Sequence, residues 1–325
     1  MKILVFLEHQ GHDLVRGSLG VLAKAAALGQ GPIAAVLAGG PEVKELAAEA
    51  GRFGASSVYI AQDEALDPPL PQPRVDVLEA IARQDGFDTF LFSNSVLGAD
   101  VAAGLAARLD AGLNWDLVDL EVDGGELTGK RLAFQDSVLI DVGWRGDRKV
   151  ALFRPGSFDP AAADSAQDPE VHEASVEFQP HSVAARVTNR RVQESEGGPS
   201  VEDSDVIVAG GMGLGAAENF ALAQDLAGVL GGVVGATRAA VYAGWYPRSG
   251  QIGQTGKTVS PKLYLALGIS GAVQHKVGMQ SSKVIVAINK DPAAPIFEFS
   301  DLAVVGDVQT IVPQLTALLR ERKGG

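Results

Sequence analysis

The sequence predicts a two-domain α/β protein: an N-terminal parallel-sheet α/β domain with an antiparallel extension, followed by a C-terminal doubly wound α/β domain. Three observations predict this fold class. The chain has 325 residues, which is long for one hydrophobic core and sufficient for two. Apolar strand-like segments alternate with helical segments in both parts of the chain. A polar segment with Gly-Gly-Pro in its middle separates these two parts.

The first part begins with segments that are alternately strand-like and helix-like. Its strands are apolar throughout rather than at every second residue, which is typical of a parallel sheet covered by helices on both faces. The expected elements are, in chain order, strand Ile3–Leu7, helix Val15–Leu28, strand Ile33–Ala38, helix Glu42–Ala50, strand Ser57–Ile60, helix Val75–Arg83, strand Thr89–Phe92 and helix Ala99–Leu109.

From about residue 114 the helical patterns stop, and short strand-like segments with tight turns follow. Turns such as Asp123-Gly124-Gly125 are typical of connections between antiparallel strands. We therefore predict an antiparallel extension that completes the first domain, residues 1–188. Its strands are expected at Leu117–Val122, Leu127–Leu132, Val138–Val142, Val150–Phe153, Ala174–Phe178 and Ser182–Val187.

The polar segment 189–205 is the predicted linker, and the second α/β domain is expected over residues 206–325. Strand and helix patterns alternate again in this second domain. Its expected elements are strand Val206–Ala209, helix Ala216–Val229, short strand Gly232–Val234, strands Leu263–Leu267, Val284–Ile288 and Leu302–Val305, and a closing helix at Val308–Arg322.

The composition excludes several kinds of site. The chain has no cysteine, which excludes disulfides, thiolate metal sites, iron–sulfur clusters and cysteine nucleophiles. Any redox chemistry must therefore come from a bound organic cofactor. The five histidines are scattered, which argues against a histidine-rich metal site. His9, His12 and Asp13 indicate a metal site only weakly, since a loop after the first strand also explains them.

The N-terminus and the apolar runs bear on location. No apolar run reaches the roughly 18 residues that a membrane span needs, so no direct membrane insertion is expected. The first apolar run is too short for a signal-peptide core and ends at Glu8, which favours a β-strand over a targeting segment. We expect a cytoplasmic bacterial protein without a signal or transit peptide.

The net charge of −13 is unevenly spread along the chain. Residues 203–325 hold nine acidic and ten basic residues, whereas residues 1–202 hold the remaining 31 acidic and 17 basic residues. The acidic first part repels nucleic acid and anionic membranes, so no nucleic-acid partner is expected. Acidity that serves only solubility is an equally good interpretation of this part. The nearly neutral second part is where an anionic ligand would fit.

The first glycine cluster of the second domain follows a strand directly. Gly211, Gly213 and Ala216 match the dinucleotide pattern G-x-G-x-x-G/A, and a helix is expected after them. An NAD site also needs an acidic residue at the end of the second strand, but this strand ends in Gly235-Ala236-Thr237-Arg238. NAD binding is therefore not favoured. A strand-to-helix turn without a ligand stays open for this cluster taken alone.

A denser set of glycine turns follows, in Gly235–Ala240, Gly253–Lys257 and Gly268–His275. Over Leu263–His275 an apolar strand leads through a glycine turn into the start of a helix. Backbone N–H groups and the helix dipole at such a turn favour a diphosphate. Ala287–Pro292 is another polar turn at a strand end, and open α/β sheets bind ligands at the carboxyl ends of their strands.

Together, these segments resemble the alpha subunit of electron transfer flavoprotein. Gly253–Asp307 is similar to the C-terminal FAD domain of that family, and Gly235–Trp245 and Gly210–Phe220 match the preceding family segments. The N-terminal domain is similar more loosely, through Met1–His9 and Gly98–Leu113. The resemblance covers the whole chain and is most specific after residue 203. It implies that the second domain binds FAD, with the flavin ring near a partner beta subunit that itself holds AMP.

The resemblance also implies roles at the flavin ring. Arg238 would lie against the ring, Thr255 would offer its hydroxyl to flavin N5, and His275 would face the pyrimidine edge near the C2 carbonyl. The cofactor-binding residues expected on this basis are Thr237, Arg238, Gln254, Thr255, Gly256, Gly268, Ser270, Gly271, Ala272, Gln274, His275, Asn289 and Asp307.

Other implied roles concern the rest of the cofactor. Thr237 and Ser270 would serve the phosphates, and Asn289 and Asp307 would hold the adenosine half. The chain departs from the family at Met212, where arginine is usual, which puts an ionic role of that turn in doubt. It also has Thr237 where serine is common, but the hydroxyl is retained.

The residue types support a redox role for such a flavin. One-electron transfer needs a stabilised flavin semiquinone, whose negative charge is favoured by a nearby cation such as Arg238 or a protonated His275. Two opposite charges ~4 Å apart interact by roughly 4 kcal/mol at an intermediate dielectric. We therefore expect Arg238, Thr255 and His275 to tune the reduction potential. No catalytic residue and no metal site are expected.

The function implied by the resemblance is that of an electron carrier, a heterodimer with the beta subunit and without substrate turnover of its own. Its FAD would accept electrons singly from flavin dehydrogenases, for example the acyl-CoA dehydrogenases of fatty acid β-oxidation, and pass them to a membrane quinone oxidoreductase. The first domain would be a scaffold that contacts the partner and binds no nucleotide.

Three alternatives stay open. An NAD-dependent dehydrogenase would turn over NADH with a small substrate. A nucleotide-binding sensor would bind FAD without stabilising a semiquinone. A bifurcating electron transfer flavoprotein would carry a second FAD in the beta subunit, so the flavin content of the complex distinguishes it from a simple carrier.

Overall fold

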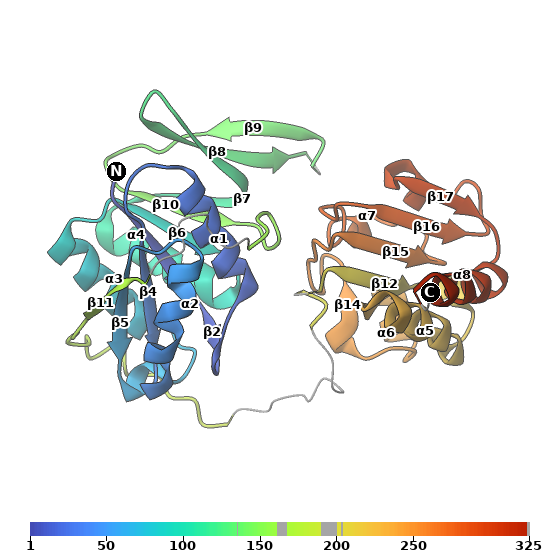
Figure 1. The fold of residues 1–325 in the computed structure, drawn as a ribbon, viewed down its shortest axis with the longest axis horizontal. Coiled ribbons are helices and arrows are strands. Elements are labelled where there is room, and N and C mark those ends of the chain that lie inside the picture. Colours follow the sequence, from blue (N-terminus) through green and yellow to red (C-terminus); the bar gives the residue numbers. More distant parts are fainter. Residues whose placement is uncertain (135, 161–167, 190–199, 203, 324–325) are drawn as a thin grey trace. The chain divides into compact units, whose positions relative to one another are not determined.

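The computed structural model describes residues 1–325 except 135, 161–167, 190–199, 203 and 324–325 (Figure 1). Contacts between residues divide the chain into two compact units, Met1–Arg191 and Val192–Gly325. Each unit has its own sheet and its own hydrophobic core, which confirms the predicted two-domain α/β class. Most of the predicted linker, 189–205, lies outside the described residues.

Nine strands of the first unit form one sheet, in the order β11-β5-β4-β1-β6-β10-β7-β8-β9. All pairs from β11 to β7 are parallel, and the pairs β7–β8 and β8–β9 are antiparallel. A small hairpin, β2 with β3, stands apart from this sheet. The strands are β1 Ile3–Leu7, β2 His9–Gln10, β3 Asp13–Leu14, β4 Ala34–Gly39, β5 Ser57–Gln62, β6 Thr89–Ser93, β7 Gly112–Asp123, β8 Glu126–Ala133, β9 Val138–Val142, β10 Lys149–Phe153 and β11 Glu170–Glu173.

Helices cover both faces of the parallel part of this sheet. Because successive strand residues point to opposite faces, Ile3, Val5 and Leu7 of β1 join the core formed with α1 and α2, whereas Leu4 and Phe6 join the core formed with α3 and α4. The helices are α1 Arg16–Ala27, α2 Ala47–Arg52, α3 Pro71–Asp85 and α4 Val96–Leu109, with 3₁₀ turns η1 Pro41–Leu46 and η2 Glu64–Leu66.

Three strand predictions in the first unit were wrong. Val150–Phe153 forms the predicted strand, but it pairs in parallel with β6 and β7 and is not antiparallel. Ala174–Phe178 and Ser182–Val187 form no strand, and the strand of this region, β11, comes just before them. Ala174, Val176 and Phe178 are half-buried against the core that α3 and α4 share. Their alternation therefore reflects side-chain packing on one face, without a strand ladder.

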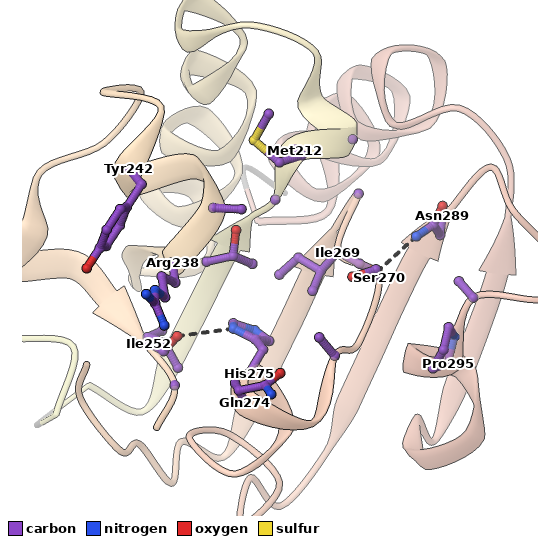
Figure 2. Close-up of a pocket in the computed structure, with 18 of the residues that line it drawn as sticks. Met212, Arg238, Tyr242, Ile252, Ile269, Ser270, Gln274, His275, Asn289 and Pro295 are labelled. Atoms are coloured by element: carbon purple, nitrogen blue, oxygen red, sulfur yellow. Dashed lines mark hydrogen bonds between the residues drawn. The ribbon is translucent and has the colours of Figure 1, made fainter. Parts of the chain in front are cut away.

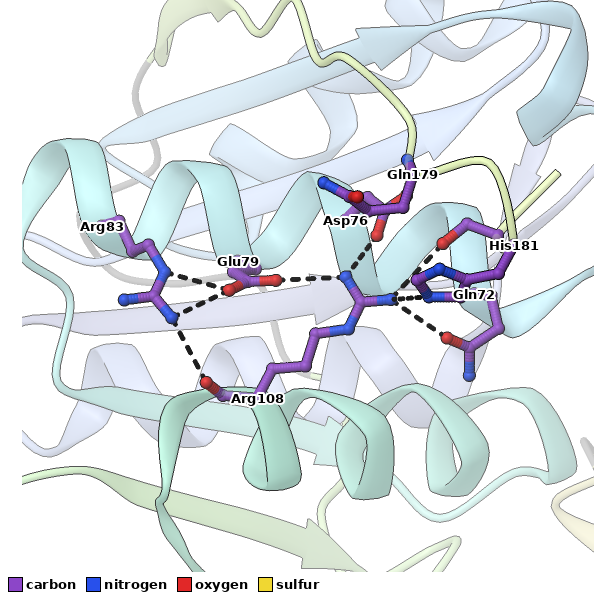
Figure 3. A network of polar contacts seen from close by, with 8 residues as sticks. Gln72, Asp76, Glu79, Arg83, Arg108, Gln179 and His181 are labelled. Atoms are coloured by element: carbon purple, nitrogen blue, oxygen red, sulfur yellow. Dashed lines mark hydrogen bonds and ion pairs between the residues drawn. The ribbon is translucent and has the colours of Figure 1, made fainter.

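Side chains hold the segment that follows β11. Arg108 of α4 contacts Asp76 and Glu79 of α3, and its guanidinium also reaches His181 (Figure 3). The second carboxylate oxygen of Asp76 accepts a hydrogen bond from the backbone N–H of Gln179 at 2.9 Å. This network fastens residues 179–182 to α3 and α4 in place of a strand ladder.

Six strands of the second unit form an entirely parallel sheet, in the order β14-β13-β12-β15-β16-β17. The chain first winds outward from β12 to β14 and then crosses to β15 and winds outward on the other side, which is the predicted doubly wound arrangement. The strands are β12 Val206–Gly210, β13 Val233–Thr237, β14 Gln251–Ile252, β15 Leu263–Leu267, β16 Ile285–Asn289 and β17 Leu302–Val305.

The two faces of this second sheet are covered differently. Helices α5 and α8 pack together on the face that includes Val208 and Leu265. Loops and short helices cover the other face through Val259, Met279 and Ile296. The helices are α5 Phe220–Leu230, α6 Arg238–Tyr242, α7 Val273–Lys276 and α8 Val308–Lys323, with 3₁₀ turns η3 Met212–Leu214, η4 Ala217–Asn219, η5 Arg248–Gly250 and η6 Pro295–Phe299.

One residue within the predicted linker belongs to the core of the second unit. Val201 is 5% exposed and packs in the core that contains Ile207 and Tyr264. Its neighbour Glu202 forms an ion pair with Lys257 at 3.0 Å. Packing of the second unit therefore begins before β12. Across the described ranges, no helix is both long enough and apolar enough to cross a membrane.

Candidate cofactor site in the second unit

A pocket of about 640 Å³ lies at the carboxyl ends of β12, β13, β14, β15 and β16 (Figure 2). These strand ends include the point between β12 and β15 where the strand order reverses, which is where open α/β sheets bind their ligands. The lining residues are Gly211, Met212, Gly213, Thr237, Arg238, Ala239, Tyr242, Ile252, Gly253, Gln254, Thr255, Gly268, Ile269, Ser270, Ala272, Gln274, His275, Asn289, Asp291, Ala294 and Pro295.

Two glycine turns touch each other at this reversal point. The N–H of Gly213, after β12, donates to the carbonyl of Gly268, after β15, at 2.9 Å. A Cβ added to Gly268 would lie 2.7 Å from the Gly213 backbone, and Gly268 has a φ of 61°. Only glycine satisfies both conditions without a shift of the backbone. The pattern at Gly211–Ala216 therefore serves the contact between the two turns that form the floor of the pocket.

The turn after β15 offers backbone donors for an anion. Among the described residues, the backbone N–H groups of residues 269–272 have no hydrogen-bond acceptor. Hydrogen bonds to its carbonyl groups fix this turn. Asn289 Nδ2 donates to the Ile269 carbonyl at 2.9 Å, and the Ile296 N–H donates to the Ser270 carbonyl at 3.0 Å. Successive free N–H groups of this kind bind phosphate oxygens. Helix α7 has only four residues, so these amides contribute more than its dipole.

Arg238 places a positive charge at another part of the pocket. It begins α6, its guanidinium lies 4.9 Å from the centroid of the Tyr242 ring, and both side chains are exposed. Within the described part of the chain, Arg238 forms no ion pair. The preceding residue, Thr237, uses its hydroxyl to cap α6 and accepts from the Ala240 N–H at 3.4 Å. The guanidinium is therefore available to a bound anion or to an electron-rich ring.

His275 is buried and neutral. It is 6% exposed, and burial lowers its pKa to about 4, against a weaker opposing effect of the Ile252 carbonyl. That carbonyl can only accept, so the imidazole Nδ1, 3.1 Å away, carries the proton. Nε2 then accepts from the hydroxyl of Tyr264 at 2.9 Å, and Tyr264 is fully buried. A protonated His275 is thus disfavoured near neutral pH, which leaves Arg238 as the cation.

The turn after β14 lies on the same side as His275. The Gln254 N–H donates to the Gln274 carbonyl at 2.7 Å, which ties this turn to α7. Gly253 has a φ of 135°, and a Cβ added to it would lie 2.7 Å from the same carbonyl. Gln254 and Thr255 are exposed as a result, and both line the pocket.

Ten of the thirteen predicted site residues line this one pocket. Gly256 and Gly271 lie just outside it, where added Cβ atoms would meet the carbonyl of Gln251 and the N–H of Ile296. Asp307 is not in the lining, and its carboxylate accepts a hydrogen bond from the Gln309 N–H at 2.9 Å at the start of α8. Its role at the adenosine stays a prediction.

Several lining residues were missed by the sequence interpretation, notably Tyr242, Ile252 and Pro295. Tyr242 follows Arg238 by four residues on one helix, a spacing that places the two side chains on the same face. That signal was present in the sequence. Ile252 and Pro295 reach the pocket only through the tertiary fold, so no local pattern marks them.

Two family models match the chain. The model described as the electron transfer flavoprotein domain matches residues 3–179, and the electron transfer flavoprotein FAD-binding domain matches residues 200–280. Electron transfer flavoprotein subunit alpha of Mycobacterium leprae is 40% identical over 325 residues, and that of Mycobacterium tuberculosis is 41% identical over 324, each alignment covering 99% of both proteins. The chain belongs to the electron transfer flavoprotein alpha-subunit family.

A further family member, the alpha subunit of Bacillus subtilis, is 35% identical over 97% of this chain and 96% of its own length. The resemblance inferred from the glycine turns is therefore confirmed. The FAD-binding match includes most of the pocket lining, from Gly211 to His275. Among the described residues, no group of three or more His, Asp or Glu side chains is placed to hold a metal ion.

The residues of the pocket fit a flavin dinucleotide. Figure 2 shows Arg238, Tyr242 and His275 toward one end, Asn289 and Pro295 toward the other, with the 269–272 turn between them. One end thus combines aromatic and cationic groups that suit a flat ring, and the free amides suit a diphosphate. The volume is in the range of cofactor sites.

Proposed function

We propose that this chain is the FAD-carrying alpha subunit of a heterodimeric electron carrier. The single observation that carries the proposal is the pocket itself, within the region that the FAD-binding family model matches. It joins the guanidinium of Arg238 to the amides of residues 269–272, and neither has an ionic or hydrogen-bond partner among the described residues. Bound FAD supplies reversible transfer of one or two electrons. The family relatives are named as subunits of a carrier, which supports a function without substrate turnover.

Different residues of the pocket would bind the diphosphate and the adenosine half of FAD. The 269–272 amides, with the hydroxyls of Thr237 and Ser270, would hold the diphosphate, and Asn289 and Asp307 would serve the adenosine half. Since Asn289 already donates to the Ile269 carbonyl, it also keeps the amide turn in shape.

The flavin end would be served by charge and by a hydroxyl. The guanidinium of Arg238 would lower the energy of negative charge on the ring and so raise the reduction potential. Thr255 would offer its hydroxyl to N5, with Gln254 and Gly256 in the same turn. His275 would face the pyrimidine edge as a neutral group, because burial lowers the pKa of its imidazole to about 4.

The relatives are named as alpha subunits, which supports a beta subunit as partner, and the other partners are part of the proposal. A beta subunit, with AMP bound in it, would complete the carrier. Flavin dehydrogenases such as acyl-CoA dehydrogenases would supply electrons, and a membrane quinone oxidoreductase would receive them. The first unit, with its antiparallel strands β7 to β9, would contact the beta subunit.

The test is the visible spectrum of the chain co-purified with its native beta subunit, followed during stepwise reduction. A flavin spectrum with one FAD per heterodimer is expected. Two FAD per heterodimer would identify a bifurcating carrier, and turnover of NADH with a small substrate would identify a dehydrogenase. A colourless complex that takes up no added FAD would overturn the proposal.

A further inference from the structure

In the two-residue strand β14, the buried side-chain amide of Gln251 lies behind the exposed hydroxyl of Thr255. Gln251 is 2% exposed and does not line the pocket, whereas Thr255 is exposed and does. Gln251 Nε2 lies 3.1 Å from Thr255 Oγ1 and donates a hydrogen bond to it. The link therefore runs from the core of the second unit to a group at the pocket surface.

The backbone holds this pair in place. The Lys257 N–H donates to the Gln251 carbonyl at 2.8 Å, and the Gly253 N–H donates to the Lys257 carbonyl at 3.1 Å. A Cβ added to Gly256 would lie 2.3 Å from the Gln251 carbonyl oxygen, so the turn folds directly back on β14. Thr255 is carried on this closed turn.

The direction of the hydrogen bond decides what Thr255 can do. The amide nitrogen can only donate, so Thr255 Oγ1 accepts and its own proton stays free. Within the described residues, that hydroxyl donates to no other group. The opposite amide orientation would make Thr255 the donor to Gln251, and no proton would be left for a ligand.

We propose that Gln251 is a positioning residue that holds the Thr255 hydroxyl as a hydrogen-bond donor toward the bound flavin. This inference rests on the proposed function, that is, on FAD in this pocket. A fixed donor at N5 favours the ring after it gains one electron, because that ring carries more negative charge than the oxidised ring. Gln251 thus raises the reduction potential without touching the flavin.

The experiment is a double-mutant cycle on the full chain co-expressed with its beta subunit. The variants are Gln251→Met, Thr255→Val and both together, with Gln224→Met, an exposed glutamine on α5, as the matched control. The readouts are the FAD content and the reduction potential of the bound FAD. Gln251→Met is expected to weaken binding of one-electron reduced FAD relative to oxidised FAD three- to tenfold, and tenfold corresponds to about 59 mV for one electron. In the Thr255→Val background the same change should shift nothing.

Two further variants separate positioning from a merely structural effect. Thr255→Ser keeps the hydroxyl, so the dependence on Gln251 should persist. Gln251→Glu puts a carboxylate behind Thr255 that accepts a hydrogen bond from its hydroxyl, so the potential should fall further than in Gln251→Met. If Gln251→Met does not retain FAD, Gln251→Leu in the two Thr255 backgrounds provides the same comparison.

The outcomes are distinct. An equal shift with Thr255 present and in the Thr255→Val background, or no shift from Gln251→Met and Gln251→Glu, overturns the positioning role while FAD binding stands. A wild-type complex that takes up no FAD overturns the proposed function and this inference with it. A shift that vanishes with Thr255→Val and persists with Thr255→Ser supports the inference.

Discussion

Arg238 carries the one positive charge without an ion pair that the described lining residues bring to the pocket, at the end proposed for the flavin ring. Replacing Arg238 with alanine is expected to lower the one-electron potential of bound FAD, because negative charge on the ring loses its nearest cation. A loss of about 1.4 kcal/mol corresponds to a fall of about 59 mV. Potentiometric titration measures this, with Arg248→Ala, another exposed arginine, as the control. Equal potentials in both variants would reject the charge argument.

His275 makes the stability of the second unit depend on pH. Its pKa is about 4 in the folded chain and about 6.5 when unfolded, so between these values only the unfolded chain takes up the proton. The stabilisation is complete above pH 6.5 and is lost as the pH falls toward 4. Between pH 7.5 and pH 5 we expect His275 to account for a fall of about 2 kcal/mol in the free energy of unfolding.

Urea unfolding at the two pH values tests this, followed by the fluorescence of Trp245, which packs in the second unit. In the His275→Asn variant the difference between pH 7.5 and pH 5 should shrink by that amount. Carboxylates contribute equally to both proteins and therefore cancel. The same pH dependence in both would mean that His275 is already charged when folded.

The contact between the two glycine turns sets a steric limit at Gly268. We expect Gly268→Ala to destabilise the second unit by about 1–3 kcal/mol and to reduce FAD retention, because the new methyl group meets the Gly213 backbone in a left-handed conformation. Gly228→Ala is the matched control. Gly228 lies within α5 with open space around it, so alanine there should stabilise the helix by up to about 1 kcal/mol. Similar losses in both variants would contradict this interpretation.

At the level of elements, Arg154 joins the antiparallel strands of the first unit to the parallel ones. It follows β10 and contacts both carboxylate oxygens of Asp116, in β7, at 2.8 Å and Asp136 at 2.6 Å. These partners raise its pKa above the usual arginine value. Removing the guanidinium leaves two half-buried carboxylates without their shared cation.

We expect Arg154→Ala to destabilise β7 to β9 by about 3 kcal/mol, and Arg154→Lys to recover less than half of that, since an ammonium cannot bind a carboxylate through two parallel N–H groups. Hydrogen exchange localises the effect: amide exchange should become faster in β7 to β9 and stay unchanged in β12. Arg145→Ala, an exposed arginine in the same unit, is the control. Exchange that is unchanged in β7 would show that other contacts hold the antiparallel strands β7 to β9 in place.

The predictable elements are those whose pattern repeats along the chain. Strands β1 and β12 and helices α1 and α8 were predicted within a few residues. Burial on both faces makes a strand apolar throughout, and burial on one face gives a helix an apolar period of 3.6 residues. The pairing direction of β10 was predicted wrongly because its position among antiparallel strands was given more weight than its sequence, which is apolar throughout as in a parallel strand. At Ala174–Phe178 alternation was real, but its cause was packing against α3 and α4.

The site divides in the same way. Thr237, Ser270 and Gln274 were expected from the family resemblance of the glycine-rich segments, and they line the pocket. The neutral state of His275 was not predictable, because burial by the tertiary fold lowers the pKa of its imidazole. Burial of that kind has no local signature.

At the scale of the whole molecule, the boundary of the second unit can be tested by dissection. Each unit has its own core, so a fragment of residues 200–325 is expected to fold alone. A fragment that begins at residue 206 lacks Val201 and the Glu202–Lys257 pair and should be less stable by about 2 kcal/mol. Thermal unfolding of the two fragments measures the difference. Equal midpoints would place the start of the domain at β12.

The reversal of strand order in the second sheet also affects how much of the protein is degraded in the cell. The pocket draws its lining from both halves of the second sheet, β12 and β13 on one side and β15 and β16 on the other. A molecule seated there holds the halves together, and at a free concentration one hundred times its dissociation constant it adds about 2.7 kcal/mol to stability. Chains made while flavin is scarce would open more often and be cleaved by proteases. The amount of carrier in the cell would then follow the amount of vitamin available to load it.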